Sequence, residues 1–148
     1  MYHVPVPADL LTMSVIACEK VLIERDDGVP SLIRLVDIVF INADIPAEKR
    51  APFLINLLVQ ARFKIGVNRA CTVHVDLIRI NGERIRMQSQ EMPDSASPHR
   101  EAPGGFNWET QVAIIPANTG TVFIEVSLED TAVRIPLTFL PAQRPASE

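Results

Sequence analysis

The segment FLINLLVQARFKIG, at Phe53–Gly66, alternates between apolar and mostly polar residues. Its alternating apolar members are Ile55, Leu57, Val59, Ala61, Phe63 and Ile65. A period of two places these side chains on one face of a β-strand. The segment therefore predicts a central strand that covers a hydrophobic core on one side and meets solvent or a partner on the other.

Seven further segments with the character of strands accompany this one. They are Met13–Arg25, Leu32–Ile41, Cys71–Ile80, Glu83–Glu91, Trp108–Ile115, Thr121–Leu128 and a last strand whose inward residues are Val133, Ile135, Leu137 and Phe139. Gly, Pro, Asn and Asp punctuate the chain between them, and Asn81-Gly82 is the strongest hairpin signal. Because no helical period competes with these strands, the sequence predicts an all-β fold. We expect an antiparallel β-sandwich of about eight strands, with immunoglobulin-like or related topology.

The domain boundaries follow from proline content and polarity. A chain of 148 residues suits one domain. Residues 1–12 contain two Val-Pro pairs and predict an extended arm, residues 13–140 the sandwich, and residues 141–148 a disordered tail. Residues 92–107 fit no period and predict a long loop. Since Pro136 has no N–H to donate, we expect the last strand to be an edge or to be bulged there.

Composition narrows the classes of partner. The net charge is −4 and the basic residues are scattered, which argues against binding to nucleic acid. No apolar run approaches the ~20 residues of a membrane-spanning helix, and the N-terminal residues lack the pattern of a secretory signal, so we expect a cytoplasmic protein without membrane contact. Cys18 and Cys71 lie in apolar runs, which favours buried reduced thiols and leaves a disulfide as the alternative.

A resemblance to known proteins extends over most of the chain. It rests on Ala17-Cys18-Glu19, Gly28, Ser31-Leu32-Ile33, Val36-Asp37, Gly120–Glu129 and Pro136-Leu137. These segments resemble a family of small uncharacterised bacterial β-sandwich proteins. The resemblance implies a β-sandwich and no activity, and the long loop at residues 92–107 looks unusual for that family.

No set of residues suited to catalysis is evident. The chain has no Gly-x-Ser-x-Gly motif, and His3, His74 and His99 are far apart in the sequence. No Cys/His spacing suits zinc, and Gly104-Gly105 matches no phosphate-binding loop. His74 and Asp76 would share a strand face, where a surface pair is the expected arrangement. We therefore expect a protein that is not an enzyme and that needs neither cofactor nor metal.

Alternate loops of a sandwich share one end, which predicts a candidate binding end. Its residues are Asp26, Asp27, Arg69, Asp94, His99, Arg100, Phe106, Trp108, Glu129 and Asp130. Calcium-binding sandwiches use loop oxygens in this manner, but solvated acidic turns are the simpler explanation because no Asp-x-Asp run is present. Phe106 and Trp108 offer an aromatic platform for a sugar or peptide. Alternatively, Trp108 fills the end of the core, because it lies on the same strand face as the apolar residues that follow it.

The leading functional hypothesis comes from Leu32–Ile41, which is apolar on both faces. If one face enters the core, the other forms a patch that monomers seldom expose. The candidate interface comprises Ile33, Leu35, Val39, Ile41, Leu54 and Leu58. We therefore expect a non-enzymatic protein that acts through protein–protein contacts, as an assembly or adaptor module and a homo-oligomer. The alternative is a ligand-binding sandwich that takes calcium, a glycan or a peptide at the acidic and aromatic end.

Overall fold

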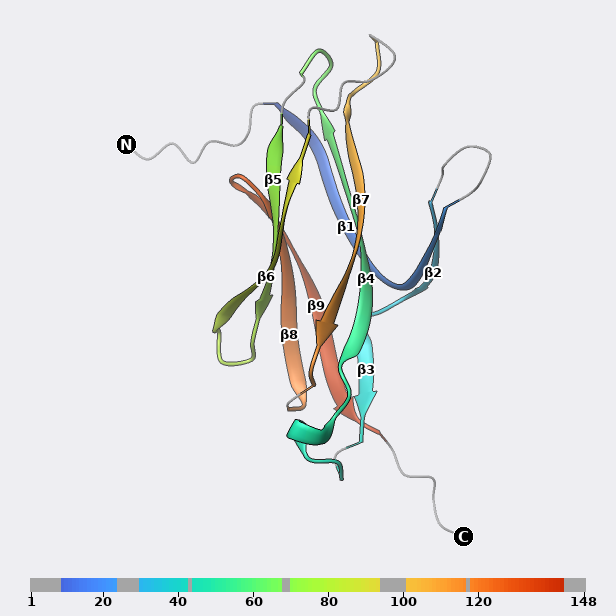
Figure 1. Ribbon diagram of the computed structural model, residues 1–148, viewed down its shortest axis with the longest axis vertical. Coiled ribbons are helices and arrows are strands. Elements are labelled where there is room, and N and C mark those ends of the chain that lie inside the picture. The colour runs from blue at the N-terminus through green and yellow to red at the C-terminus, as the bar shows by residue number, and fades with distance from the viewer. Residues whose placement is uncertain are drawn as a thin grey trace.

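The computed structural model describes residues 9–23, 30–42, 44–67, 70–93, 101–116 and 118–142. The elements, in chain order, are β1 (Leu10–Ile23), β2 (Pro30–Leu35), β3 (Ile38–Ile41), the 3-10 turn η1 (Ala47–Lys49), β4 (Phe53–Phe63), β5 (Cys71–Ile78), β6 (Arg84–Met92), β7 (Gly105–Ile114), β8 (Gly120–Leu128) and β9 (Thr131–Pro141). They form a four-stranded sheet of order β2-β1-β4-β7 and a five-stranded sheet of order β3-β9-β8-β5-β6 (Figure 1). The prediction of an all-β fold built as a sandwich is confirmed.

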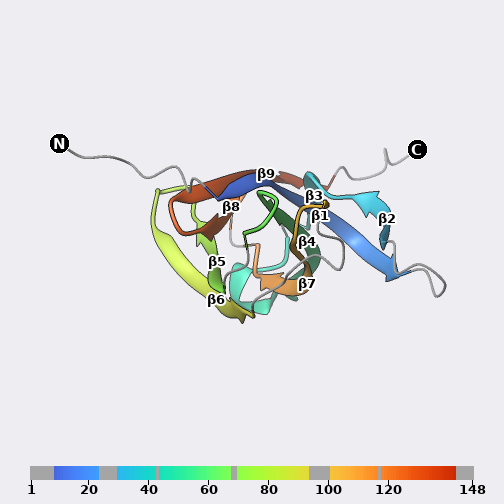
Figure 2. The ribbon, with the colours of Figure 1, turned by 90° about the horizontal axis from the view of Figure 1, so that it is seen from above.

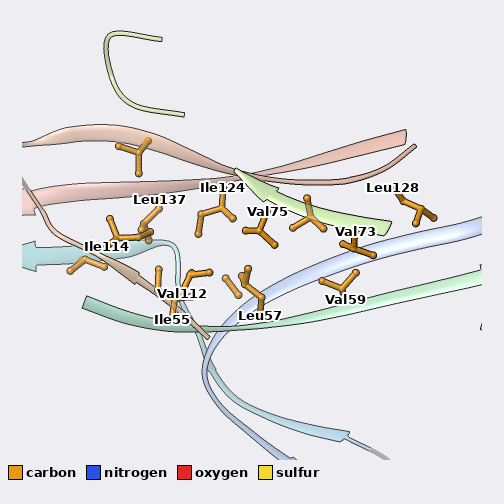
Figure 3. Packing of buried hydrophobic residues seen from close by; sticks show 14 of the residues in the cluster. Ile55, Leu57, Val59, Val73, Val75, Val112, Ile114, Ile124, Leu128 and Leu137 are labelled. Atoms are coloured by element: carbon orange, nitrogen blue, oxygen red, sulfur yellow. The ribbon is translucent and has the colours of Figure 1, made fainter. Parts of the chain in front are cut away.

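The hydrophobic core lies between the two sheets, which enclose a common interior when seen from above (Figure 2). Side chains from both sheets point toward one another there, among them Leu57 and Val59 from β4 and Val75 and Ile124 from the opposite sheet (Figure 3). All four are fully buried. The core is therefore a single layer of interdigitated apolar side chains, as expected for two packed sheets.

The register predicted for β4 is confirmed from Ile55 to Phe63, whose inward side chains are all buried. β1 and β7 pair with β4 on its two sides, so β4 is the central strand that the sequence predicts. Ile65 is the exception, because the strand ends at Phe63 and Ile65 is 59% exposed. The chain turns there at Gly66, which has a positive φ of 84°.

The segment expected as one strand, Leu32–Ile41, is two strands in different sheets. β2 pairs with β1 in the first sheet, and β3 pairs in parallel with β9 in the second. The Val36 N–H donates to the Ala17 carbonyl oxygen, whereas the Asp37 carbonyl oxygen accepts from the Thr138 N–H. The prediction of a continuous strand is therefore wrong, because the chain crosses from one sheet to the other between these two residues. Because one expected strand is divided, the described residues form nine strands where eight were expected.

Three strand boundaries also differ from the expected ones. β1 begins at Leu10, so residues 10–12 of the expected arm belong to the sheet, and β9 extends to Pro141. β7 begins at Gly105, inside the predicted long loop. Gly105 has a φ of 149°, and a Cβ there would lie 2.0 Å from the Ala61 carbonyl oxygen. Only glycine allows β7 to approach β4 this closely.

The hairpin predicted at Asn81-Gly82 joins β5 to β6. The Arg79 N–H donates to the Glu83 carbonyl oxygen, and the Gly82 N–H donates back to the Arg79 carbonyl oxygen. Gly82 takes a positive φ of 86°, which is the left-handed conformation that this glycine permits. The dipeptide therefore marks the turn as the sequence predicts.

Pro136 occupies the position that its missing N–H requires. It pairs with Phe123 of β8 and precedes Thr138, the first residue of β9 that β3 joins. The Thr138 N–H points toward β3, so the Pro136 nitrogen, two residues earlier, points to the same side before β3 has begun. The last strand is therefore an edge at Pro136, as predicted.

The first prediction concerns the core register. Leu57→Ala should lower the free energy of unfolding by about 2–5 kcal/mol, because Leu57 is fully buried and the change leaves a cavity. Gln60→Ala, on the opposite face of the same strand, should cost less than about 1 kcal/mol. Urea unfolding of both variants measures the difference. A larger loss for Gln60→Ala would mean that the faces of β4 are assigned the wrong way round.

A second prediction concerns the two thiols, which the structure holds in reduced form. Cys18 is fully buried, while Cys71 is half-buried and lines a small pocket beside Met92. Iodoacetamide should therefore modify Cys71 faster than Cys18 in the native protein, and both at similar rates in denaturant. Mass spectrometry of the digested protein measures each site. Equal native rates would show that the strand carrying Cys18 opens readily.

Candidate interaction surface

Only part of the expected acidic and aromatic end lies among the described residues. Asp26, Asp27, Arg69, Asp94, His99 and Arg100 lie outside the described residues. Glu129 and Asp130 form the exposed turn between β8 and β9, and Glu129 has a positive φ of 52°. Among the described residues, no group of three or more His, Cys, Asp or Glu side chains is placed to hold a metal ion.

Three connections share one end of the sandwich. Cys71 pairs with Met92 and Val73 pairs with Leu128, so the ends of β6 and β8 lie beside the start of β5, which follows β4. Asp26 and Asp27 belong to the connection between β1 and β2, outside the described residues, so their clustering at this end stays a prediction.

The two aromatic residues belong to the core. Phe106 and Trp108 lie on the inner face of β7, opposite Ala61 and Val59 of β4, and both pack against the buried cluster. Each is half-buried. Of the two readings open from the sequence, the structure favours Trp108 as a plug for the core over an aromatic platform.

Charged side chains gather on the outer face of the five-stranded sheet. Val75 and Val126 point into the core, so their neighbours Asp76 and Glu125 point outward. The hairpin partners of these carboxylates are Arg86 and Arg134. Together with Arg84, we call these five residues the arginine ladder; it crosses β6, β5, β8 and β9.

Each carboxylate oxygen of the arginine ladder accepts from a guanidinium. The Arg86 Nε lies 2.7 Å from Asp76 Oδ1, and the Arg84 Nη1 lies 2.9 Å from Asp76 Oδ2. The same Arg84 Nη1 also donates to Glu125 Oε1, and the Arg134 Nε lies 2.6 Å from Glu125 Oε2. The two carboxylates are almost completely buried, whereas the three arginines are about half exposed. Arg84 thereby links one hairpin to the other.

This geometry fixes the protonation of the arginine ladder. Burial alone would raise the pKa of Asp76, but hydrogen bonds from Arg86 and Arg84 outweigh it and hold that pKa below its ordinary value. The hydrogen bond from Arg84 lowers the pKa of Glu125, against its burial, with help from Arg134. Hydrogen bonds to Glu125 and Asp76 raise the pKa of Arg84. All three groups therefore stay charged at neutral pH, which suits a structural ion-pair network and not proton transfer.

His74 extends this network without forming a dyad with Asp76. Its Nδ1 lies 2.7 Å from Ser89 Oγ and 3.0 Å from Arg86 Nη1. Because a guanidinium nitrogen only donates, Nδ1 is the acceptor in the contact with Arg86. The expected pair of His74 and Asp76 is thus joined through Arg86, as a surface arrangement.

A second feature of the same sheet is its β3 edge. β3 is the terminal strand of the five-stranded sheet and lies beside β9 (Figure 1). The carbonyl oxygens of Asp37 and Ile41 accept from β9 and its C-terminal extension, so the backbone groups of Ile38 and Phe40 point to the other side. Among the described residues, no strand pairs with them on that side.

The side chains at the β3 edge are apolar and exposed. Ile38 is 48% exposed and Phe40 is 64% exposed, and Leu140, the neighbour of Phe40 on β9, is also exposed. We call Ile38, Phe40 and Leu140 the β3 strip. An apolar strip along an open strand edge is a surface that proteins normally cover or pair.

The predicted interface residues fall in different places. Val39 and Ile41 are buried in the core, so within β3 the faces are the reverse of those assigned from the sequence. Leu58 is also buried, and Leu54 is exposed on the outer face of β4. Ile33 and Leu35 are placed by their backbone opposite Lys20 and Cys18. The exposed apolar patch thus has other members than those expected.

Comparisons with known proteins give no assignment. No protein-family model matches the chain, and no curated protein matches it either. The resemblance to small bacterial β-sandwich proteins stays a prediction. Within the described part of the chain, no helix has the length and apolar character needed to cross a membrane.

A prediction follows from the lowered pKa values of Asp76 and Glu125. A carboxyl whose pKa is lower in the folded protein stabilises the fold above its ordinary pKa of about 4, and this contribution is lost as the pH falls through the folded pKa. Glu125→Gln should therefore lower the free energy of unfolding at pH 7 by about 1–3 kcal/mol. The difference in the free energy of unfolding between Glu125→Gln and the wild type should become smaller below a pH of about 4.

Glu83→Gln is the matched control for this prediction. Glu83 also pairs with an arginine, Arg79, but both side chains are more than half exposed. An exposed pair is worth little, so the change should cost under about 1 kcal/mol. Denaturant unfolding at several pH values measures both variants. Equal losses of unfolding free energy in the two variants would contradict the role of Glu125 as a buried ion-pair partner. A difference between Glu125→Gln and the wild type that does not change with pH would also contradict it.

Proposed function

We propose that this protein is a non-enzymatic, immunoglobulin-like β-sandwich that acts through protein–protein contacts at its β3 edge. The partner we propose is a second copy of the same chain, so that the protein is a homo-oligomer. The bacterial family and the cytoplasmic location expected from the sequence belong to the same proposal.

Strand order supports the immunoglobulin-like assignment. The order β1-β4-β7 in one sheet and β9-β8-β5 in the other follows the A-B-E and G-F-C orders of that fold. β6 extends the second sheet beyond β5, as additional strands do in variable-type domains. Such a scaffold is compatible with adaptor and assembly roles, but the function depends on the residues at its surface.

The observation that carries the proposal is the coincidence of two features at the β3 edge. Ile38 and Phe40 have backbone groups directed away from β9, and the same two residues expose large apolar side chains. A partner strand added at this edge would form hydrogen bonds with these backbone groups and would cover these apolar side chains. A second copy supplies such a strand with the same properties, and a two-fold axis makes the contact self-complementary.

The arginine ladder supports a non-enzymatic role. Its carboxylates and Arg84 are held in their charged forms, so none is poised to exchange a proton near neutral pH. The network ties together four strands of the sheet to which β3 belongs.

Light scattering after size exclusion tests the proposal with Phe40→Lys. The wild type should elute as a dimer or larger assembly, and Phe40→Lys should be a monomer, because a charge on an edge strand opposes pairing. The Phe40→Lys monomer should still unfold cooperatively, since Phe40 is 64% exposed on the single chain. Val39→Lys would be unsuitable because Val39 is buried, and unfolding would mimic dissociation.

Ile65→Lys is the matched control, since Ile65 is 59% exposed and follows the end of β4, away from the β3 edge. The Ile65→Lys variant should have the same molar mass by light scattering, and so the same assembly state, as the wild type. A wild type that is monomeric at all concentrations, or a Phe40→Lys variant that keeps the assembly, would refute the proposal. Equal dissociation by both variants would show that general surface charge, and not the β3 edge, controls the mass.

A further inference from the structure

A pocket of about 680 Å³ opens at the end of the sandwich where the connections β5–β6 and β7–β8 lie. Its apolar lining comes from both sheets: Leu77, Ile114, Val122 and Phe139 contribute from four different strands. Its size falls in the usual range for small-molecule sites, roughly 300–1,000 Å³. The candidate binding end expected from the sequence does not include any of these residues.

Two contacts hold the rim of this pocket in place. The Arg50 Nη1 donates to the Pro116 carbonyl oxygen at 2.8 Å, which anchors the connection between β7 and β8. On the other side, Ile80 lies over Gly120, where an added Cβ would be only 2.8 Å from the Ile80 Cδ1. The rim is thus formed in the unliganded fold, which lowers the entropic cost of binding.

Apolar side chains continue to the mouth of the pocket. Ile80 is more than half exposed and Ile115 is 59% exposed, and both line the pocket. The apolar surface of the lining is therefore open to solvent at the mouth. A ligand with an apolar body would remove this surface from water, at about 0.8 kcal/mol for each buried methylene group.

Arg79 supplies the polar end of the site. It lines the pocket, and its guanidinium is engaged only through Nη1, 3.3 Å from Glu83 Oε2. No other partner of that guanidinium lies among the described residues, and the pair with Glu83 is more than half exposed. An exposed pair at this distance is weak, whereas a carboxylate can take two hydrogen bonds from one guanidinium.

We propose that this pocket binds a small carboxylic acid with an apolar body, such as a medium-chain fatty acid. The apolar body lies against Leu77, Val122 and Phe139, and the carboxylate accepts hydrogen bonds from Arg79. Asn81 and Asn118, which also line the pocket, add amide groups near the head of the ligand. The site does not depend on the β3 edge or on self-association.

Calorimetric titration with octanoate tests this site, with octanol as the uncharged analogue. Octanoate should bind, and Arg79→Gln should weaken octanoate about tenfold while leaving octanol unchanged. Lys64→Gln, which removes an exposed positive charge outside the pocket, should leave both affinities unchanged. No binding of octanoate to the wild type, or an equal loss for octanoate and octanol in Arg79→Gln, would overturn the proposal.

A second pair of variants tests the location. Ile115→Asp puts a negative charge at the mouth and should abolish octanoate binding, whereas Ile65→Asp changes a side chain of the same 59% exposure outside the pocket and should not. Both positions tolerate a polar residue because they are exposed, and melting curves confirm that each variant is folded. If the two variants bind octanoate equally well, the acid binds elsewhere and the proposal fails.

Discussion

The fold depends on the contact between the inner face of β4 and the five-stranded sheet. Leu57 and Val59 are fully buried against that sheet, and each such side chain contributes roughly 1.5–3 kcal/mol by leaving water. β1 and β7 both take their register from β4, since they pair with it along most of its length. A shift of β4 by one residue would turn its apolar side chains outward and misplace both neighbours.

The arginine ladder supplies the second constraint, which acts on the opposite surface. Asp76 and Glu125 are the only buried charged residues in the described part of the chain, and an unpaired carboxylate in either place would be costly. Arg84 donates to both, so the hairpin β5–β6 and the hairpin β8–β9 are held in one register. The hydrophobic core determines that the sheets pack, and these charges help to determine how four of the strands align.

The crossing at Val36 and Asp37 creates the β3 edge. It lets the chain leave the first sheet and add a short strand to the second, beyond β9. The opposite edge is different, because Gln88 of β6 forms hydrogen bonds with Thr110 and Gln111 of β7 and so connects the two sheets. Within the described part of the chain, polar contacts thus close one edge, while the β3 edge has exposed apolar side chains and no partner strand on its outer side.

The sequence by itself determined the inner faces of β4, β5 and β8 and the pairing inside each hairpin. Asp76 faces Arg86 and Glu125 faces Arg134 because each pair is symmetric about its turn, so local chain geometry is sufficient. The signal is present in the sequence, because the hairpin at Asn81-Gly82 returns the strand that carries Arg84 and Arg86 beside Asp76. The alignment of Asp76 with Glu125 was not predictable, since it joins strands that are distant in sequence.

Only the tertiary structure decided which side chains of Leu32–Ile41 enter the core. Its residues are apolar on both faces, so periodicity could not tell which side enters the core, and within β3 the face expected outside is the buried one. Pairing with β9 settled this choice by turning Val39 and Ile41 inward beside Phe139, which left Ile38 and Phe40 outside. The pocket likewise depends on four strands and two connections that meet only in the folded chain. Local patterns specify strands and turns, whereas surfaces and cavities arise from the packing of strands far apart in sequence.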